Sequence, residues 1–300
     1  MKVSIVIVSY NAVNLLIDCL SSIMDHSKTA PEIIVVDNGS TDRSVELLAK
    51  EFPQIRLIPL AENMGFGAGN NRGAAVATGE LLFFLNNDTV LLEDTPAQLA
   101  GLMETHADVG ACGPKLVNGD GGFQLSFGSD PSLLNEWKFR RMHRRLRKKD
   151  SAFRSKLESR YSASTEVDWV TGAVLMLRRD VFREIGGFDE TFFLYFEDAD
   201  ICRRVRELGL KVLYVPTTKV VHFGGQSLGT AGQQIAVEYR RSQLYYYQKH
   251  SRPVTQLFLR VYLICKFGIH WLYSSVDRGR PRWVASEIIK LSLRSSFGKS

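Results

Sequence analysis

The chain has 300 residues, of which 45% are hydrophobic and 23% charged, and its net charge is +6. This composition is that of a globular protein and excludes a disordered or collagen-like chain. The length allows one large domain, or a catalytic domain with an appendage. The four cysteines form no CxxC pair, which favours reduced thiols in a cytosolic setting over disulfides or structural zinc; they are Cys19, Cys112, Cys202 and Cys265.

The amino-terminal part of the chain alternates between strand-like and helix-like patterns. Apolar runs predict strands over 3–8, 33–36 and 80–85, and a further strand is expected at 55–58. Apolar spacing predicts a helix over 13–24. A second helix, capped by Ser40 or Thr41, is expected to end at about residue 52, and a third, opened by the stretch 63–71, is expected to end at residue 77. The opening MKVSIVIVSYN has no small-residue cleavage site, so we expect a first strand and not a signal peptide. The alternation predicts an α/β fold with a doubly wound, mostly parallel central sheet flanked by helices.

Polar side chains follow three of these strands. They are Tyr10, Asn11, Asp37, Asn86, Asn87 and Asp88, the last three within LLFFLNNDT. Parallel strands place these ends at one edge of the sheet, where doubly wound proteins bind ligands. A carboxylate such as Asp88 at that edge suits a divalent cation that also takes substrate phosphate oxygens, although a polar β-turn explains the same residues.

A glycine-rich stretch at 65–69 lies in NMGFGAGNNRG, after the third strand. It lacks the G-x-G-x-x-G spacing and does not follow the first strand, so it does not fit a Rossmann NAD site. Glycines at these positions let the backbone come close to a neighbouring element or to a nucleotide.

The rest of the chain continues less regularly. We expect helices at 95–105, 179–184, 197–208 and 232–249, a turn at 119–122 and a loop at 224–227. Strands are expected at 109–117, 167–177, 211–215 and 219–222.

Residues 138–160 form a basic segment. It holds eleven Lys and Arg against Asp150 and Glu158, and without it the chain would be slightly acidic. As a helix, one side would carry the apolar residues Phe139, Met142, Leu146, Phe153 and Leu157. The segment is either a solvated surface or a site for an anionic membrane or a diphosphate-bearing acceptor. Nucleic acid is not an expected partner, because aromatic interleaving and a known binding motif are both missing from the sequence.

The apolar stretch 254–276 is long enough to span a bilayer but contains Arg260, Lys266 and His270. At helical spacing these residues gather on one side with Gln256 and Ser274. This pattern favours an amphipathic helix that lies in the membrane interface over one that spans the membrane, and the alternative to both is a helix that packs on the protein's own core.

Three carboxylates and one histidine are candidates for chemistry. Glu197, Asp198 and Asp200 open a helix, where the macrodipole stabilises acids. Three carboxylates in four residues also raise one another's pKa and supply a general base. His222 ends a strand before a Gly-Gly loop and is a candidate metal ligand, although a single histidine is more often structural.

Six ordered motifs together resemble a known family. They are VSIVIVSYN, IIVVDNGSTD, NMGFGAGNNRG, LFFLNNDT, DWVTGAVLMLRRDVFREIGGFDETFFLYFEDADICRRV and VVHFGGQS. The chain resembles the family 2 glycosyltransferases over about residues 1–250, and within them the bacterial rhamnosyltransferases. The resemblance implies a GT-A fold and inverting transfer from a nucleotide sugar.

The resemblance also implies roles by motif position. Tyr10 would stack on the base, and Asp37 would accept the imide N–H of uracil or thymine. The run at 86–88 takes the place of the family's DxD, with Asp88 as a metal ligand, His222 as the second ligand, and Mg²⁺ or Mn²⁺ as the cation. Asn86 replaces the first acid of that motif, which puts tight metal binding in doubt.

The remaining roles concern the acceptor and the sugar. Asp198 would deprotonate the acceptor, Glu197 would tune Asp198, and Trp169 would line the sugar pocket. The other expected substrate or nucleotide contacts are Asn11, Asn63, Gly65, Asn70, Asn86, Asn87 and Asp200.

The expected function is metal-dependent transfer of rhamnose from dTDP-rhamnose to a lipid-linked or polysaccharide acceptor in bacterial cell-surface glycan synthesis. Alternatives are transfer of another sugar from a UDP or dTDP donor, and a non-catalytic nucleotide-sugar-binding module. A nucleotidyltransferase would need a basic triphosphate loop, which SYNAVN does not offer.

The expected domains are a glycosyltransferase domain at 1–250 and a basic amphipathic helical region at 251–300. Within the first, residues 1–118 would bind the donor, 119–166 form the basic insert, and 167–250 hold the acceptor and catalytic half. The C-terminal helical region is expected to be membrane-associated, which would place the protein in the cytoplasm, peripherally on the cytoplasmic face of the bacterial inner membrane.

Overall fold

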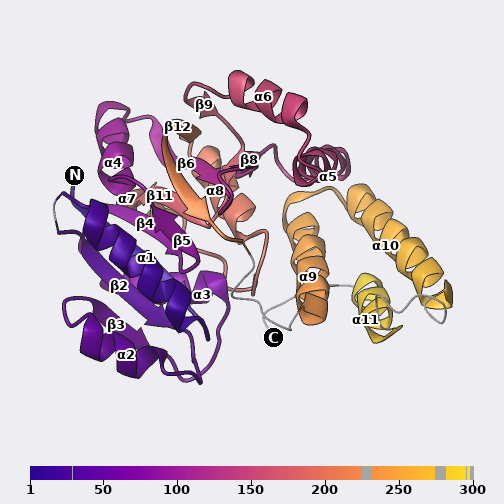
Figure 1. The fold of residues 1–300 in the computed structure, drawn as a ribbon. Helices are drawn as coiled ribbons and strands as arrows, with labels where there is room; N and C mark the ends of the chain where they lie inside the picture. The colour runs from indigo at the N-terminus through magenta and orange to yellow at the C-terminus, as the bar shows by residue number, and fades with distance from the viewer. Residues whose placement is uncertain (29, 225–231, 274–281, 295, 298–300) are drawn as a thin grey trace. The chain divides into compact units, whose positions relative to one another are not determined.

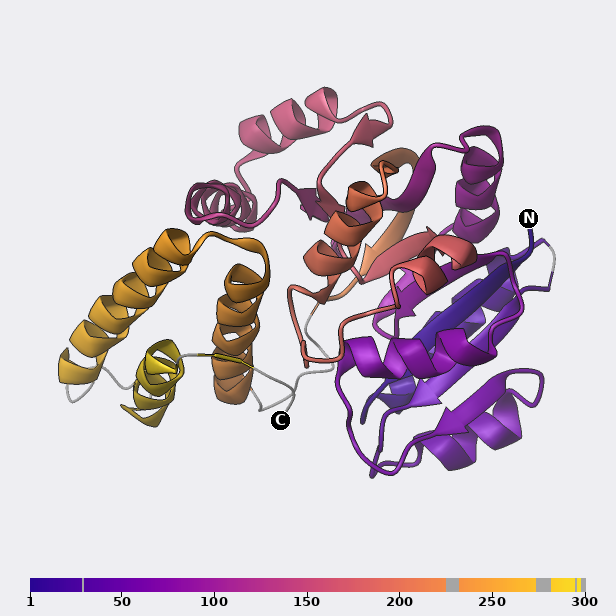
Figure 2. The same cartoon turned by 180° about the vertical axis from the view of Figure 1, so that it is seen from behind.

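The computed structural model describes residues 1–28, 30–224, 232–273, 282–294 and 296–297. The chain forms two compact units, residues 1–188 with 198–227, and residues 189–197 with 228–300. The first unit carries the central sheet, and the second consists mainly of C-terminal helices (Figures 1 and 2). The boundary expected at residue 250 falls inside the second unit. Of the loop expected at 224–227, only Gly224 lies within the described residues.

The centre of the first unit is a sheet with the strand order β3-β2-β1-β4-β11-β6-β12-β5. β1 (Val3–Ser9) lies parallel to both β2 (Glu32–Asp37) and β4 (Leu81–Asn86), and β3 (Arg56–Pro59) extends this parallel half. The four strands are those expected from the sequence. The burial of β1, β2 and β4 on both faces explains why their apolar runs do not alternate with polar residues, whereas β3 lies at the edge of the sheet and is partly exposed.

The second half of the sheet mixes directions. β6 (Val109–Val117) and β12 (Lys211–His222) are parallel, whereas β11 (Val174–Arg178) is antiparallel to both β4 and β6. β5 (Thr89–Leu91) and the short β9 (Thr165–Glu166) are antiparallel to β12, and β7 (Phe123–Gln124) is antiparallel to β6. Because β1, β2, β3 and β4 are parallel neighbours and β6 is parallel to β12, the prediction of a mostly parallel central sheet is confirmed.

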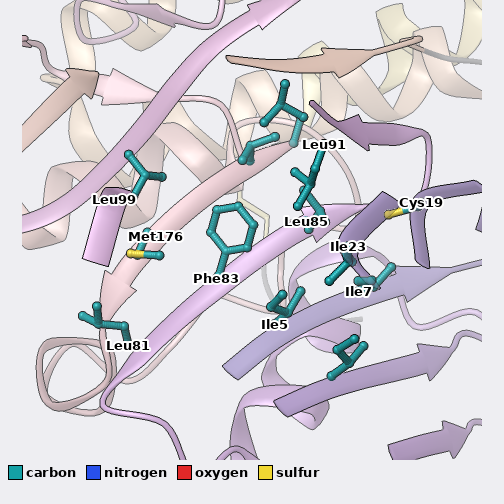
Figure 3. Close-up of a cluster of buried hydrophobic side chains, with 14 of the residues drawn as sticks. Ile5, Ile7, Cys19, Ile23, Leu81, Phe83, Leu85, Leu91, Leu99 and Met176 are labelled. Atoms are coloured by element: carbon teal, nitrogen blue, oxygen red, sulfur yellow. The ribbon is translucent and has the colours of Figure 1, made fainter. Parts of the chain in front are cut away.

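Helices cover both faces of this sheet. On one face, Ile5, Ile7 and Phe83 pack in a core with side chains of α1 (Val13–His26), α2 (Ser44–Glu51) and α4 (Thr95–Thr105), part of which Figure 3 shows. On the other face, Val6 and Phe84 pack in a core with side chains of α3 (Phe66–Val76), α7 (Arg179–Glu184) and α8 (Glu197–Glu207). The doubly wound arrangement follows from alternate residues of β1 and β4 pointing to opposite cores.

The cysteines are free, as expected from their spacing. Burial raises the pKa of the Cys19, Cys112 and Cys202 thiols to about 12. These three thiols are therefore unreactive core residues. Cys265 is exposed.

Three local predictions are wrong. α2 begins at Ser44, because Ser40 and Thr41 lie in a loop in which their N–H groups bond to Asp37 and Asn11. The strands expected at 211–215 and 219–222 are one strand, β12, whose pairing with β6 shifts beside Pro216, which has no N–H to donate. The strand expected at 167–177 is interrupted between β10 (Trp169–Val170) and β11.

The basic segment forms two helices, α5 (Leu133–Arg147) and α6 (Ser151–Arg160). Asp150 caps α6, since its side chain accepts a hydrogen bond from the Phe153 N–H at 3.0 Å. The expected apolar side is confirmed: Leu157 is buried in the core of the first unit, and Phe139, Met142, Leu146 and Phe153 pack against that core.

The second unit contains α9 (Gly232–His250), α10 (Pro253–Tyr273) and α11 (Arg282–Leu293), which contact one another. Asp189 ties the segment 189–197 to α9, because its carboxylate accepts hydrogen bonds from Lys249 Nζ at 2.7 Å and Tyr245 Oη at 2.9 Å. Burial opposes ionisation of Asp189, but these and other donors hold its pKa well below the usual range. Within the described ranges, no helix combines the length and the apolarity needed to cross a bilayer.

Candidate functional site

The polar ends of β1, β2 and β4 lie at one edge of the sheet. Their register pairs Ser9 with Asp37 and Val8 with Asn86. The prediction that these strand ends share an edge is confirmed, because all three strands run in the same direction. Two groups of side chains occupy this edge, one at the ends of β1 and β2 and one at the end of β4.

Asn11 joins the loops that follow β1 and β2. Its Oδ1 accepts hydrogen bonds from the N–H of Thr41 at 2.8 Å and of Asp42 at 3.3 Å, and its N–H donates to Ser40 Oγ at 3.0 Å. Asn11 has a φ of +49°, a left-handed conformation that asparagine tolerates better than most residues. The network fixes the loop beside Tyr10, whose ring is exposed and available for stacking.

Asp37 is buried at the end of β2. Its Oδ2 accepts a hydrogen bond from the Ser40 N–H at 3.0 Å, whereas its Oδ1 has no donor among the described residues. A buried carboxylate oxygen without a donor is costly unless a ligand supplies one.

Asn38 holds the loop before α3 against the end of β2. Its Nδ2 donates to Asn63 Oδ1 at 2.9 Å and to the Gly65 carbonyl at 3.1 Å, and its Oδ1 accepts from the Met64 N–H at 2.9 Å. Gly39, at φ +77°, is required here, because a Cβ would lie 2.6 Å from the carbonyl carbon of Glu62. Asn63 and Gly65 are therefore brought to the same edge as Asp37.

Asn70 differs from the other residues that are predicted to contact the nucleotide sugar. It is buried within α3, and its Nδ2 donates to the Phe66 carbonyl at 3.0 Å. This bond occupies its amide within its own helix. Asn87 also makes an internal bond, from its Nδ2 to Ser9 Oγ at 2.9 Å, which ties the end of β4 to the end of β1.

Asp88, just after β4, lies beside His222, the last residue of β12. Asp88 Oδ1 is buried 3.3 Å from His222 Nε2 and has no hydrogen-bond donor among the described residues. His222 Nδ1 lies 2.9 Å from Gln124 Oε1, an acceptor, so Nδ1 carries the ring proton and Nε2 presents a lone pair. Two facing acceptors repel unless a proton or a cation lies between them.

These residues fit a divalent cation that takes its other ligands from substrate and water. Within the described part of the chain, no group of three or more His, Cys, Asp or Glu side chains forms a closed metal site. Mg²⁺ is commonly held by one or two carboxylates plus substrate phosphates, so a site with Asp88 and His222 suits transient binding with the donor. Asn86, with its Nδ2 3.5 Å from His222 Nε2, adds no second carboxylate.

Asp198 lies in the first turn of α8. Its Oδ2 accepts a hydrogen bond from the Gly172 N–H at 3.2 Å, and its Oδ1 accepts from the Ala199 N–H at 2.8 Å. Burial raises the pKa of this carboxyl above its usual value, although these N–H donors act to lower it. A partly exposed carboxylate with a raised pKa is suited to accept a proton.

One short loop connects the end of β4, next to Asp88 and His222, to Asp198. Residues 171–173 interrupt the strand expected at 167–177. The Ala173 carbonyl accepts a hydrogen bond from the Asn86 N–H at 2.8 Å, and the next residue back, Gly172, donates to Asp198. A Cβ on Gly172 would lie 3.1 Å from the Phe66 ring, so the loop also packs on the start of α3. Three segments distant in sequence therefore converge at residues 171–173.

The remaining predicted residues have separate surroundings. Trp169 donates from Nε1 to the Ser129 carbonyl at 2.9 Å, and its ring packs on Phe139 of α5 at 5.4 Å between centroids. Asp200 is buried in an ion pair with Arg204 at 2.8 Å. Glu197 is buried at the start of α8.

Sequence reasoning missed several residues of this edge. Gln124 orients His222, Ser9 binds Asn87, Asn38 links two loops, and Gly172 binds Asp198. Gly172 and Asn38 lie inside recognisable motifs, whereas Gln124 comes from a two-residue strand with no sequence signal. Separately, in the second unit, Tyr195 and Phe196 have φ values of +72° and +68°, a strain of about 1–3 kcal/mol each.

The fold is of the GT-A type found in solved glycosyltransferase structures. Among solved structures, GalNAc-T7 with UDP, GalNAc and Mn²⁺ superposes with a TM-score of 0.58 and 17% identity, covering 82% of this chain and 50% of that one. The mannosyltransferase PcManGT from Pyrobaculum calidifontis, in complex with GDP-Man and Mn²⁺, gives 0.55 and 16% over 97% and 70%. At these identities the likeness shows the fold alone.

The chain belongs to glycosyl transferase family 2, whose pattern matches residues 4–186. A second family, described as the N-terminal domain of galactosyltransferase, matches residues 152–224. The N-acetylglucosaminyl-diphospho-decaprenol L-rhamnosyltransferase of Mycobacterium tuberculosis is 28% identical over 251 residues, which is 77% of this chain and 80% of that protein. The rhamnosyltransferase WbbL of Escherichia coli is 39% identical over 66 residues, or 22% of this chain and 25% of that protein. The protein is thus a glycosyltransferase with rhamnosyltransferase relatives.

Proposed function

We propose that this glycosyltransferase inverts the sugar it transfers, and that it moves rhamnose from dTDP-rhamnose to a lipid-linked or polysaccharide acceptor in bacterial cell-surface glycan synthesis. The observation that carries the proposal is the facing pair of acceptors, Asp88 Oδ1 and His222 Nε2, linked through Asn86 and residues 171–173 to Asp198. The name of the mycobacterial relative, which contains both an L-rhamnosyl transfer and a diphospho-decaprenol, supports this choice of sugar and acceptor.

The donor base is proposed to bind at the ends of β1 and β2. Asp37 Oδ1 is a buried acceptor without a donor among the described residues, and thymine or uracil presents one imide N–H that fits it. Tyr10 is exposed beside it and would stack on the base. The loop bonds of Asn11 and Asn38 keep this region in shape before the nucleotide arrives.

The donor diphosphate is proposed to bind beside Asp88 and His222, together with Mg²⁺ or Mn²⁺ held by these two side chains. When bound, the cation supplies positive charge to the leaving nucleoside diphosphate. Gln124 keeps the lone pair of His222 Nε2 directed at this position through its bond to Nδ1.

Asp198 is proposed to act as the general base. As the acceptor hydroxyl oxygen forms a bond to the anomeric carbon, Asp198 takes the hydroxyl proton. The bond from that carbon to the phosphate oxygen breaks, and the nucleoside diphosphate leaves with the electron pair. Attack from the face opposite the leaving group inverts the anomeric centre. Trp169 would line the sugar pocket, and Glu197 would tune Asp198.

An anionic membrane on the cytoplasmic face is proposed as the place where the acceptor is met. The support in the first unit is the basic α5, where Lys138, Arg141, Arg144, Arg147 and Lys148 are exposed. Arg145 is paired with Asp150 at 2.7 Å and Arg140 with Glu136 at 4.0 Å, so the exposed group is the better target for charge removal. Each such residue contributes about 1 kcal/mol near an anionic surface, and less as salt screens it.

The test is a thermal-shift screen of dTDP, UDP and GDP and of their sugars, each with and without Mg²⁺ or Mn²⁺. We expect the largest stabilisation from dTDP-rhamnose with cation, and transfer of rhamnose to a lipid-linked acceptor in a following assay. A UDP-sugar that stabilises and reacts better than dTDP-rhamnose would show another donor. A guanine nucleotide as the best ligand would contradict the choice of a thymidine or uridine donor.

A further inference from the structure

The outward face of α10 is apolar along its whole length. Six aliphatic and aromatic side chains expose 49% to 64% of their surface there: Val254, Leu257, Phe258, Val261, Ile269 and Leu272. At about 100° per residue these six positions all fall on one side of the helix, with exposed Cys265 between Val261 and Ile269, so they form one stripe. We call these six residues the α10 stripe. At 1.5 Å per residue, the 21-residue helix is roughly 30 Å long.

The opposite face of α10 packs within the second unit. Leu259, Leu263 and Phe267 are buried, in a helix that contacts α9 and α11. Arg260 lies on this inner side as well, and its Nη1 donates to the carbonyls of Ser292, at 3.0 Å, and Arg294. Burial lowers the pKa of Arg260, although arginine remains charged.

Two polar residues of α10 are thus not on its solvent-facing side. Gln256 and Arg260, expected to form a polar face, are partly buried and bonded to backbone carbonyls of the same unit. Of the other residues of that expected face, Lys266 is exposed, His270 is partly buried, and Ser274 lies outside the described residues. The stripe side of the helix is apolar, because Gln256 and Arg260 lie on the inner side and are bonded within the unit. Figures 1 and 2 show α10 as a long helix beside α11.

Two features identify what covers the α10 stripe. Tyr262 and Tyr273 are exposed on the same helix, and amphipathic rings of this kind concentrate at the headgroup level of bilayers. Residues 251–300 contain nine Lys and Arg against Asp277 and Glu287, and α10 itself has no acidic residue. Of these basic residues, Arg252, Lys266, Arg282 and Arg294 are exposed in the described part of the chain. An apolar stripe on a unit with exposed basic residues complements the headgroup and acyl boundary of an anionic bilayer.

We infer that the α10 stripe inserts into the interface of an anionic phospholipid bilayer, with α10 lying in the plane of the membrane. Every helix in the described ranges is too short or too polar to span, which agrees with an in-plane helix. The inference deepens the proposed function, on which it rests for the lipid-linked acceptor, by naming the side chains that enter the lipid. Apolar insertion and basic attraction together supply the two signals that stable anchoring needs.

The chain offers its own probe position for a test. Cys265 is exposed on α10, whereas Cys19, Cys112 and Cys202 are buried. An environment-sensitive fluorophore on Cys265 of the full chain should shift to the blue with vesicles of phosphatidylglycerol and phosphatidylethanolamine. Lipids with a quencher on the acyl chain should reduce its emission. Emission unchanged by vesicles would overturn the inference.

A negative charge placed in the α10 stripe distinguishes insertion of the apolar side chains from electrostatic attraction to the anionic bilayer. Leu257→Glu and Ile269→Glu each put a carboxylate where we expect acyl chains, and each should weaken vesicle flotation about ten- to a hundredfold, the cost of losing one buried aliphatic side chain. Leu92→Glu is the matched control, because Leu92 is an exposed leucine of the first unit, 43% exposed. It should float like the parent. Melting temperatures of the three variants should match that of the parent, since all three sites are exposed.

Two outcomes would overturn the inference. In one, the stripe variants float as well as the parent. In the other, the parent binds no vesicles, and sedimentation shows a dimer that the Leu257→Glu substitution dissociates. A second copy of the chain would then cover the α10 stripe. Vesicle binding without any glycosyl transfer would leave the inference standing and count against the proposed function alone.

Discussion

The two ends of the candidate site differ in how their polar atoms are used. At the ends of β1 and β2, Asn11 and Asn38 each make several bonds between loops, and the region is shaped without a ligand. At the end of β4, Asp88 Oδ1 and His222 Nε2 face each other as acceptors, and Asp198 carries a raised pKa. At the ends of β1 and β2, the hydrogen bonds hold the loops in one conformation, which favours binding. The second end keeps lone pairs for a cation and a proton, which favours chemistry.

The largest expected effect comes from the base. Asp198→Asn keeps the size of the side chain and removes its ability to accept a proton, so kcat should fall about 10²–10⁴-fold. Donor binding should stay within about twofold, because Asp198 is proposed to act on the acceptor. Steady-state transfer and calorimetric donor titration measure the two quantities. A variant that keeps most of its kcat would remove Asp198 from the mechanism.

The raised pKa of Asp198 gives two pH predictions. The kcat of the parent should fall as pH drops through this pKa, because the protonated carboxyl is no base. A carboxyl with a folded-state pKa above its unfolded value costs stability once pH exceeds the unfolded value. Asp198→Asn removes that cost, so its melting temperature at pH 7 should rise above that of the parent. The difference should shrink at about pH 4, near the pKa of an unfolded aspartate. A lower melting temperature at pH 7 would contradict the burial argument.

The second effect separates the two ends of the site. Asp88→Asn should remove the stimulation of donor binding by Mg²⁺ or Mn²⁺ and lower transfer at least about a hundredfold, more than a change in an outer ligand costs. Asp37→Asn is the matched control at the other end. It should weaken nucleotide binding by about tenfold with and without cation, the value of a hydrogen bond to a charged group. Full activity of the parent in EDTA would contradict the metal role of Asp88 and His222.

The fold was largely predictable because burial leaves strong local patterns. The apolar runs of β1, β2 and β4 are continuous since both sheet faces carry helices, and their polar ends are visible as abrupt changes in residue type. The antiparallel β11 was not predictable, because its VLML sequence is as apolar as a parallel strand. Strand direction is set by partners distant in sequence.

The site was predictable only where side chains lie in strong motifs. Asp37, Asp88 and Asp198 each stand at the end or start of an element, so local sequence shows them. Gln124 contacts His222 across 98 residues of chain, and a two-residue strand gives no periodicity to find it. The inward orientation of Arg260 was equally hidden, because it depends on carbonyls of α11.

The third effect tests whether Gln124 directs His222. Gln124→Leu leaves Nδ1 without its acceptor, so the ring can rotate or change tautomer. The cation concentration for half-maximal activity should rise about tenfold, at the low end of the range for second-sphere residues. Gln124→Glu is the matched control, because a carboxylate also accepts from Nδ1 and should keep cation affinity at or above that of the parent. An unchanged cation dependence in the leucine variant would show that Gln124 has no such role.

The smallest expected effect comes from Asn11, which lies at the ends of β1 and β2. Asn11→Ala removes three hydrogen bonds to an exposed loop and places alanine at a φ of +49°. Each exposed bond contributes about 0.5–1.5 kcal/mol at most, and the loop can be partly re-solvated, so we expect the KM for the donor to rise about three- to tenfold with kcat unchanged.

Two further substitutions divide this effect into its causes. Asn11→Gly removes the same bonds but accepts the positive φ, so it should match the alanine variant in KM and exceed it in melting temperature, because alanine at that φ costs about 1–2 kcal/mol. Asn11→Asp keeps an acceptor for the Thr41 and Asp42 N–H groups and should bind the donor nearly as well as the parent. If kcat fell instead of KM rising, the loops at the ends of β1 and β2 would take part in the transition state. The division between a binding end and a chemical end would then be wrong, since a residue that only shapes the nucleotide site acts equally on the bound donor and on the transition state.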